Sequence, residues 1–166
     1  NSPHAMESIS AARREFGNEV HVGAGTVKNA EIARQAIDAG AEFMLSPIMF
    51  TQEIFDLARD AGVITVPAAF SPTEIQRMID MGADIVKVFP AGQLGPDYIK
   101  AVQAPLGKLP LMVVGGVNVA NVQSYFDKGA TYAGIGSGIF APADIEACDS
   151  AKLAAAVARL EESVTW

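Results

Sequence analysis

The sequence predicts an α/β fold built from about six consecutive βα units in a single domain, residues 1–166. A motif in which a helix ends, a glycine follows and a strand begins recurs four times along the chain. The strands in question are apolar almost throughout, as parallel strands covered by helices on both faces require. The stretches between them show helical spacing and capping residues. Such a series forms either a (β/α) barrel or an open doubly wound sheet.

The composition restricts the function classes. Half of the 166 residues are hydrophobic and the net charge is −7, so the chain lacks the basic surplus that binds nucleic acids. Cys148 is the only cysteine and there are two histidines, which argues against a disulfide and a metal centre. We therefore expect chemistry without a metal or cofactor. No run of about 18 apolar residues and no leader-like start is present, so a cytoplasmic protein is expected.

The repeated motif contains a glycine at the same point each time. The four copies are "DAGAEFMLSP", "DAGVITVPAA", "DMGADIVKVF" and "DKGATYAGIG", with Gly40, Gly62, Gly82 and Gly129. A helix commonly ends on a residue in the left-handed conformation, which glycine adopts without steric cost. Each copy is therefore predicted to end a helix and to start a strand.

The helices are predicted from their capping residues and apolar spacing. In "SPTEIQRMID", Ser71 is the N-cap, Pro72 suits the first position and Glu74 completes a capping box. Residues 3–16 form a further predicted helix, and the last predicted helix has Asp149 or Ser150 as its N-cap. Other amphipathic stretches start near Asn29, Thr51 and Asn118.

The strands are predicted at residues 19–25, 41–47, 63–69, 84–90, 111–117 and 132–138. A closed barrel needs eight strands, so the first two strands of a barrel would have to lie upstream of Asn1.

The predicted strand "DIVKVFP" places Lys87 within an apolar run. Alternation puts Ile85, Lys87 and Phe89 on one face. Burial would favour the free amine, which attacks carbonyl groups and forms Schiff bases. The alternatives are a lysine that extends to solvent from the strand end or pairs with a carboxylate.

Two pairs of small residues lie at the ends of the last two predicted strands. Gly115 and Gly116 occur in "VVGGVN", and Gly136 and Ser137 occur in "GIGSGIF". In barrels the loops after the final strands commonly bind phosphate through backbone N–H groups. Tight turns without a ligand are the alternative.

Two further strand ends are candidates for a binding site. Thr26 ends "VGAGT", where its hydroxyl would hold a carboxylate or carbonyl group, or would cap the next helix instead. Pro47 ends "LSP" and would shape a pocket wall, or would simply open a loop.

Together these motifs resemble the 2-keto-3-deoxy-6-phosphogluconate and -galactonate aldolases, class I lyases on a (β/α)8 TIM barrel. The matching elements are "VGAGTV", "LSP", "VKVFPA", "VGGV" and "GIGS", in that order across nearly the whole chain. The stretch "GPDYIKAV" is closer to the galactonate branch.

The resemblance implies a site and a reaction. Lys87 would form the Schiff base, Phe89 would pack beside it, and Thr26 and Pro47 would line the pyruvyl end. Gly115, Gly116, Gly136 and Ser137 would bind the phosphate. The products would be pyruvate and glyceraldehyde 3-phosphate, and the resemblance implies a homotrimer.

One departure from the family concerns the general base. The family's glutamate and a substrate-binding arginine precede "NSP", so both would lie upstream of Asn1. We expect an otherwise ordinary aldolase that lacks about 40 residues of a barrel of about 200. The alternatives are an incomplete barrel that folds with partner subunits, a phosphosugar isomerase or synthase on a related barrel, and a catalytically impaired phosphate-binding subunit.

Overall fold

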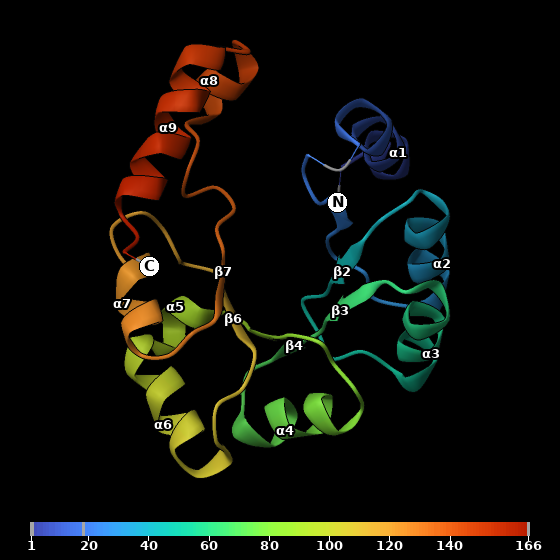
Figure 1. Cartoon of the computed structure of the whole chain (residues 1–166), viewed down its shortest axis with the longest axis vertical. Helices are drawn as coiled ribbons and strands as arrows, with labels where there is room; N and C mark the ends of the chain where they lie inside the picture. Colours follow the sequence, from blue (N-terminus) through green and yellow to red (C-terminus); the bar gives the residue numbers. More distant parts are fainter. Residues whose placement is uncertain (1, 18, 166) are drawn as a thin grey trace. The chain divides into compact units, whose positions relative to one another are not determined.

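The computed structural model describes residues 2–17 and 19–165 of the chain. It contains two compact units, Asn1–Lys87 and Val88–Trp166, which are described separately below (Figure 1). Parallel strands alternate with helices in both units, which confirms the predicted α/β class. The prediction of a single domain stays a prediction.

The first unit contains four helices and five short strands among its described residues. They are α1 (Ala5–Phe16), β1 (Gly23–Ala24), α2 (Ala30–Asp38), β2 (Phe43–Leu45), α3 (Gln52–Ala61), β3 (Ile64–Val66), β4 (Ala68–Ala69), α4 (Pro72–Asp80) and β5 (Val86–Val88), whose last residue belongs to the second unit. Strands β1, β2 and β3 form a parallel sheet in this order. In the register of this sheet, Gly23 lies opposite Phe43, and Phe43 lies opposite Ile64.

The helix boundaries of the first unit follow the predicted capping residues. Asn29 accepts a hydrogen bond from the N–H of Ile32 at the start of α2. Ser71 and Glu74 form the complete capping box of α4. The glycines predicted at helix ends, Gly40, Gly62, Gly82 and Gly129 in the second unit, all have positive φ, between 68° and 97°. Local sequence therefore determines where these helices begin and end.

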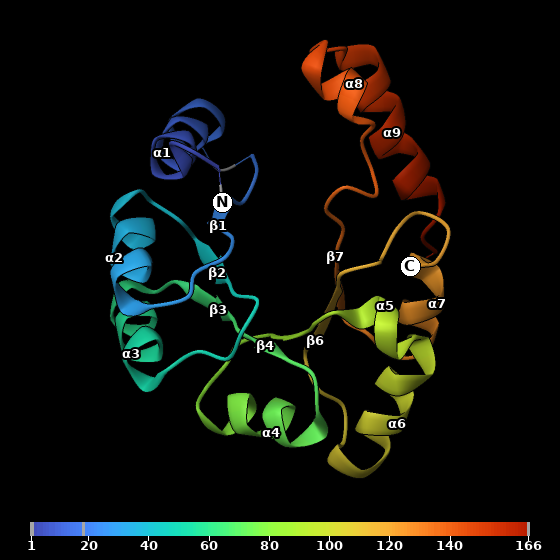
Figure 2. The same ribbon diagram turned by 180° about the vertical axis from the view of Figure 1, so that it is seen from behind.

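The core of the first unit lies between its helices and its strands. Helices α2 and α3 lie side by side along β2 and β3 (Figures 1 and 2). Their buried residues include Ala36 and Ile54, and Met44 of β2 is fully buried. Burial of such side chains contributes roughly 1.5 to 3 kcal/mol each for the larger ones. This packing fixes α2 and α3 against the sheet of the first unit.

The second unit contains two paired strands and five helices among its described residues. They are α5 (Ala91–Leu94), α6 (Pro96–Leu106), β6 (Leu111–Val114), α7 (Val122–Asp127), β7 (Tyr132–Gly134), α8 (Pro142–Glu146) and α9 (Ser150–Glu162). Strands β6 and β7 are parallel, with Met112 opposite Tyr132. Asp149 caps α9 by accepting a hydrogen bond from the N–H of Lys152, as predicted.

Several elements differ from the sequence prediction. The strand predicted at 63–69 is divided into β3 and β4 around Pro67, because proline has no N–H to continue the ladder. The helix predicted to start near Asn118 begins at Val122. Helices α5, α6 and α8 were not predicted.

Candidate functional site

Lys87 lies in the middle of β5, between the fully buried residues Val86 and Val88. Only 8% of Lys87 is exposed. Burial lowers the pKa of its ammonium group, because the charged form loses its hydration. Lys87 is therefore buried, and burial favours the free base over the ammonium ion relative to an exposed lysine.

A row of backbone hydrogen bonds joins the strand ends of the first unit. The N–H of Lys87 donates to the carbonyl of Pro67 at 2.8 Å. The N–H of Ser46 donates to the carbonyl of Val66 at 3.2 Å, and that of Val27 donates to Leu45 at 3.0 Å. The row thus runs through neighbouring segments that contain Thr26, Pro47 and Lys87. The structure places Thr26 and Pro47 just after β1 and β2 and Lys87 within β5, so that one row of hydrogen bonds connects their three segments in the first unit.

Thr26 has a positive φ of 64°, in the segment that follows β1. This conformation is a genuine outlier for a β-branched residue and costs of the order of 1 to 3 kcal/mol. Backbone strain of this kind clusters at binding and catalytic sites. The next residue, Val27, is fully buried, so the surrounding packing maintains the turn.

Pro47 follows Ser46, whose side chain is completely buried. The Ser46 hydroxyl oxygen accepts a hydrogen bond from the N–H of Ile48 at 3.1 Å, and the N–H of Ala68 donates to the carbonyl of Ile48 at 3.0 Å. These bonds fix the turn at Pro47. Sequence reasoning missed Ser46 and Pro67, although "LSP" and "TVP" mark both turns as proline-containing strand ends.

The second unit contains a pocket of about 350 Å³ after its two strands. Backbone and small side chains line it, and all four predicted phosphate residues are among them: Val114, Gly115, Gly116, Val117, Asn118, Gly136, Ser137 and Gly138. A pocket lined by glycines lets an anion approach backbone N–H groups closely. The structure brings these four residues together, and their binding of phosphate stays a prediction.

Phe89 belongs to the second unit and packs against the glycine loop. A Cβ atom on Gly115 would lie 3.0 Å from the Phe89 ring and 3.3 Å from the Cα of Pro90. Gly115 and Gly116 also have positive φ values of 86° and 81°. Glycine is therefore required here both by the backbone and by the close approach. The predicted packing of Phe89 beside Lys87 stays a prediction.

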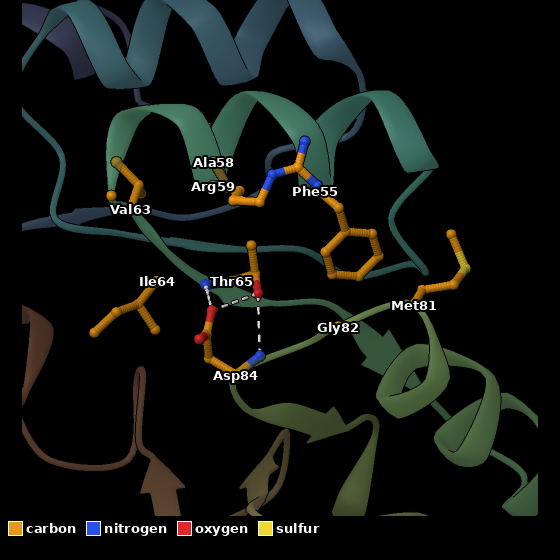
Figure 3. A pocket seen from close by; sticks show the side chains of 10 residues that line it. Phe55, Ala58, Arg59, Val63, Ile64, Thr65, Met81, Gly82 and Asp84 are labelled. Atoms are coloured by element: carbon orange, nitrogen blue, oxygen red, sulfur yellow. Dashed lines mark hydrogen bonds between the residues drawn. The ribbon is translucent and has the colours of Figure 1, made fainter.

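A different pocket, of about 360 Å³, lies at the amino end of β3 in the first unit (Figure 3). Figure 3 shows Thr65 facing Asp84, whose carboxylate accepts bonds from the N–H and the hydroxyl of Thr65 at 2.8 and 2.7 Å. These contacts join β3 to the segment just before β5. We interpret this pocket as a structural feature.

Other classes of site have less support. Among residues 2–17 and 19–165, no cluster of His, Cys, Asp or Glu is arranged to hold a metal ion. Cys148 is exposed, after α8 and far along the chain from β5. Within this described part of the chain, no helix is both long and apolar enough to span a bilayer.

Comparison with known proteins gives a consistent family assignment. The family model for KDPG and KHG aldolases matches residues 1–156. A protein of Rhizobium meliloti strain 1021 named "Probable 2-dehydro-3-deoxy-6-phosphogalactonate aldolase" is 36% identical over 143 residues, covering 86% of this chain and 67% of the relative. The 2-dehydro-3-deoxy-6-phosphogalactonate aldolase of Escherichia coli K12 is 32% identical, covering 84% of this chain and 68% of the relative. The chain thus spans about two thirds of the length of both relatives.

The fold is also shared with solved structures. A native KDPGal structure superimposes with a TM-score of 0.85 at 30% identity and covers 98% of this chain and 79% of that one. The predicted class, an α/β fold of the TIM-barrel type, is therefore confirmed. A closed barrel is not detected among the described residues.

Proposed function

The chain belongs to the KDPG and KHG aldolase family, and on this premise we propose that it is a class I aldolase that cleaves a 2-keto-3-deoxy-6-phospho sugar acid. The products are pyruvate and glyceraldehyde 3-phosphate. The observation that carries the proposal is the buried Lys87, with its lowered pKa, in a row with Thr26 and Pro47. A desolvated lysine amine is the group that Schiff-base chemistry needs.

The proposed reaction begins when the free amine of Lys87 attacks the C2 ketone of the substrate. Loss of water from the carbinolamine gives an iminium ion. When the C4 hydroxyl loses its proton, the C3–C4 bond breaks and its electron pair moves into the iminium, leaving an enamine and the aldehyde. Protonation of the enamine at C3 and hydrolysis release pyruvate and the free lysine. We assign no residue of this chain to removal of the C4 hydroxyl proton.

The other predicted residues would bind the ends of the substrate. Thr26 and Pro47 would contact the pyruvyl end, and Phe89 would provide an apolar surface. The backbone around Gly115, Gly116, Gly136 and Ser137 would bind the phosphate, because these residues line one pocket and small residues let an anion approach backbone N–H groups.

Trapping with pyruvate and borohydride tests the proposal. Reduction of the iminium should attach one pyruvyl group to the protein, and peptide mapping should locate it on Lys87. Lys87→Met should abolish the adduct, whereas Lys108→Met, at an exposed lysine, should leave it unchanged. A folded sample that forms no adduct, or forms it elsewhere, would refute the Schiff-base assignment. This result would instead favour an isomerase or synthase, or a phosphate-binding subunit.

Two finer properties can be measured on the same sample. Pyruvate release from the galactonate and the gluconate epimers, compared as kcat/KM, gives the substrate preference. We also propose a homotrimer, on the family resemblance, and sedimentation equilibrium should give three times the chain mass of 17.4 kDa. A monomer at all concentrations would contradict this assembly.

A further inference from the structure

The loop from Gly115 to Val117 is held through its carbonyl groups. The N–H of Gly92 donates to the carbonyl of Gly115 at 2.7 Å. The side-chain amide of Asn121 donates through Nδ2 to the carbonyl of Gly116 at 2.9 Å. In a planar trans peptide the N–H points away from the C=O of the same group. The N–H groups of Gly116 and Val117 therefore point away from Gly92 and Asn121 respectively.

Asn121 is itself held firmly at the start of α7. Its Oδ1 accepts a hydrogen bond from the N–H of Asn118 at 2.8 Å, so both ends of its amide are used. Its backbone N–H donates to the carbonyl of Asn118 at 3.1 Å, and the hydroxyl of Ser124 donates to its carbonyl at 2.6 Å. The amide of Asn121 thus clamps the two ends of the segment from Gly116 to Asn118. Asn121 does not itself line the glycine pocket.

The pocket retains unused donors. Within the part of the chain that the structure describes, the N–H groups of Gly116, Val117, Ser137 and Gly138 have no acceptor in the protein. Gly116 has φ of 81°, and a Cβ there would lie 3.1 Å from the Cα of Gly92, so the loop is closely packed on one side. Its N–H groups are left available to a ligand on the other side.

We propose that Asn121 is the positioning residue of the phosphate site: by holding the Gly116 carbonyl and the Asn118 N–H, it orients the Val117 N–H toward the substrate phosphate. This inference rests on the proposed function. Hydrogen bonds to an ionised group are about twice as strong as neutral ones, so misdirecting one donor should weaken phosphate binding about tenfold. Bond cleavage at C3–C4 should be unaffected, because Asn121 contacts no reacting atom.

Two substitutions separate positioning from general support of the fold. Asn121→Ala removes both side-chain bonds. Asn121→Asp keeps an acceptor for the Asn118 N–H but replaces the donor with an oxygen that repels the Gly116 carbonyl. The matched control is Gln123→Ala, in the same helix, which removes an amide that bonds to Asp127 and to the N–H of Thr165 at 2.8 and 2.7 Å outside the pocket.

The measurements are inorganic phosphate binding by calorimetry, pyruvate trapping at Lys87, and KM and kcat for the phosphorylated substrate. Both Asn121 variants should bind phosphate about tenfold more weakly and raise KM similarly, with kcat and trapping within about twofold of the parent. Gln123→Ala should change none of these. Equal phosphate binding by the parent and by folded Asn121→Asp would overturn the inference and leave the proposed aldolase chemistry intact. If the parent protein binds phosphate but traps no pyruvate, only the proposed Schiff-base chemistry is overturned. If the parent protein binds no phosphate, the phosphate site and this inference are both overturned.

Discussion

The backbone N–H of Lys87 donates a 2.8 Å hydrogen bond to the carbonyl oxygen of Pro67. Pro67 lies between β3 and β4. Because proline has no backbone N–H, it takes part in this pairing only as an acceptor. The bond fixes the backbone of Lys87 beside the neighbouring strand end. The side chain of Lys87 therefore starts from a defined position, and its burial changes its chemistry.

The first prediction concerns the pH dependence of pyruvate trapping. Because burial lowers the pKa of Lys87, the free amine should accumulate below the pH at which an ordinary lysine, with a pKa of 10.5, deprotonates. The rate of adduct formation should rise with pH and level off below this value. Trapping rates measured across neutral and alkaline pH test this, and a rate that still follows an unshifted lysine would contradict the assignment.

Lys87→Met should stabilise the protein by about 1 kcal/mol at neutral pH while abolishing trapping, since it removes a charge that burial disfavours. Below the folded-state pKa of Lys87, the lysine is protonated in both the folded and the unfolded protein. The folded protein then bears the whole free-energy cost of desolvating the charged ammonium group. Between this pKa and 10.5 the native lysine is neutral and the unfolded one is charged, so parent stability rises with pH. The advantage of Lys87→Met should shrink over the same range. Urea unfolding at several pH values measures it, with Lys108→Met as the control.

Replacing Thr26 should separate stability from binding. Thr26→Gly relieves a positive φ of 64° and should stabilise the fold by about 1 kcal/mol, after allowance for the greater freedom of glycine in the unfolded chain. It should also weaken pyruvate binding, because the hydroxyl is lost. Thr26→Ser should retain binding. Chemical unfolding measures the stability, and the pyruvate concentration that half-saturates trapping measures the binding. An unchanged half-saturating concentration in Thr26→Gly would exclude a role for the hydroxyl in binding.

Gly115 and Gly136 should respond differently to substitution by alanine. Gly115→Ala places a Cβ 3.0 Å from the Phe89 ring at a φ of 86° and should destabilise the protein by about 2 kcal/mol. Gly136 has no atom within 4 Å of a built Cβ, so Gly136→Ala should change stability by less than about 0.5 kcal/mol. Thermal unfolding compares them, and equal losses would show that the Phe89 contact is unimportant.

The capping box of α4 should contribute a pH-dependent stability. Glu74 accepts hydrogen bonds from the N–H groups of Phe70 and Ser71, both at 2.8 Å, and these bonds lower the pKa of its carboxyl group below 4.5. Glu74→Ala should cost about 1 kcal/mol above pH 4.5.

The difference between Glu74→Ala and the parent should disappear as the pH falls through the lowered folded-state pKa, where the parent carboxylate becomes protonated. Glu31→Ala is the control, since Glu31 lies in the first turn of α2, which Asn29 caps instead. A cost that persists in acid would mean that packing, and not the ionised cap, is responsible.

Helix ends were predictable where one or two residues decide them. The capping box of Ser71 and Glu74 satisfies backbone groups within the first turn of α4, and Gly62 does so at the end of α3. A few neighbouring residues are therefore enough to predict these helix ends. Helix α6 was missed although Pro96 opens it, because Pro105 near its end interrupts the helical pattern. The division between β3 and β4 could have been predicted from Pro67.

The sequence by itself determined the residue types and their order: a lysine inside an apolar strand, prolines and a threonine at strand ends, and pairs of small residues at the ends of the last two strands. Tertiary structure alone decided that Thr26, Pro47 and Lys87 follow one row of hydrogen bonds, and that Asn121 holds the carbonyl of Gly116. The physical reason is distance along the chain. Capping and turn preferences act within a few residues, whereas strand pairing and side-chain clamps join segments whose contact depends on the packed fold.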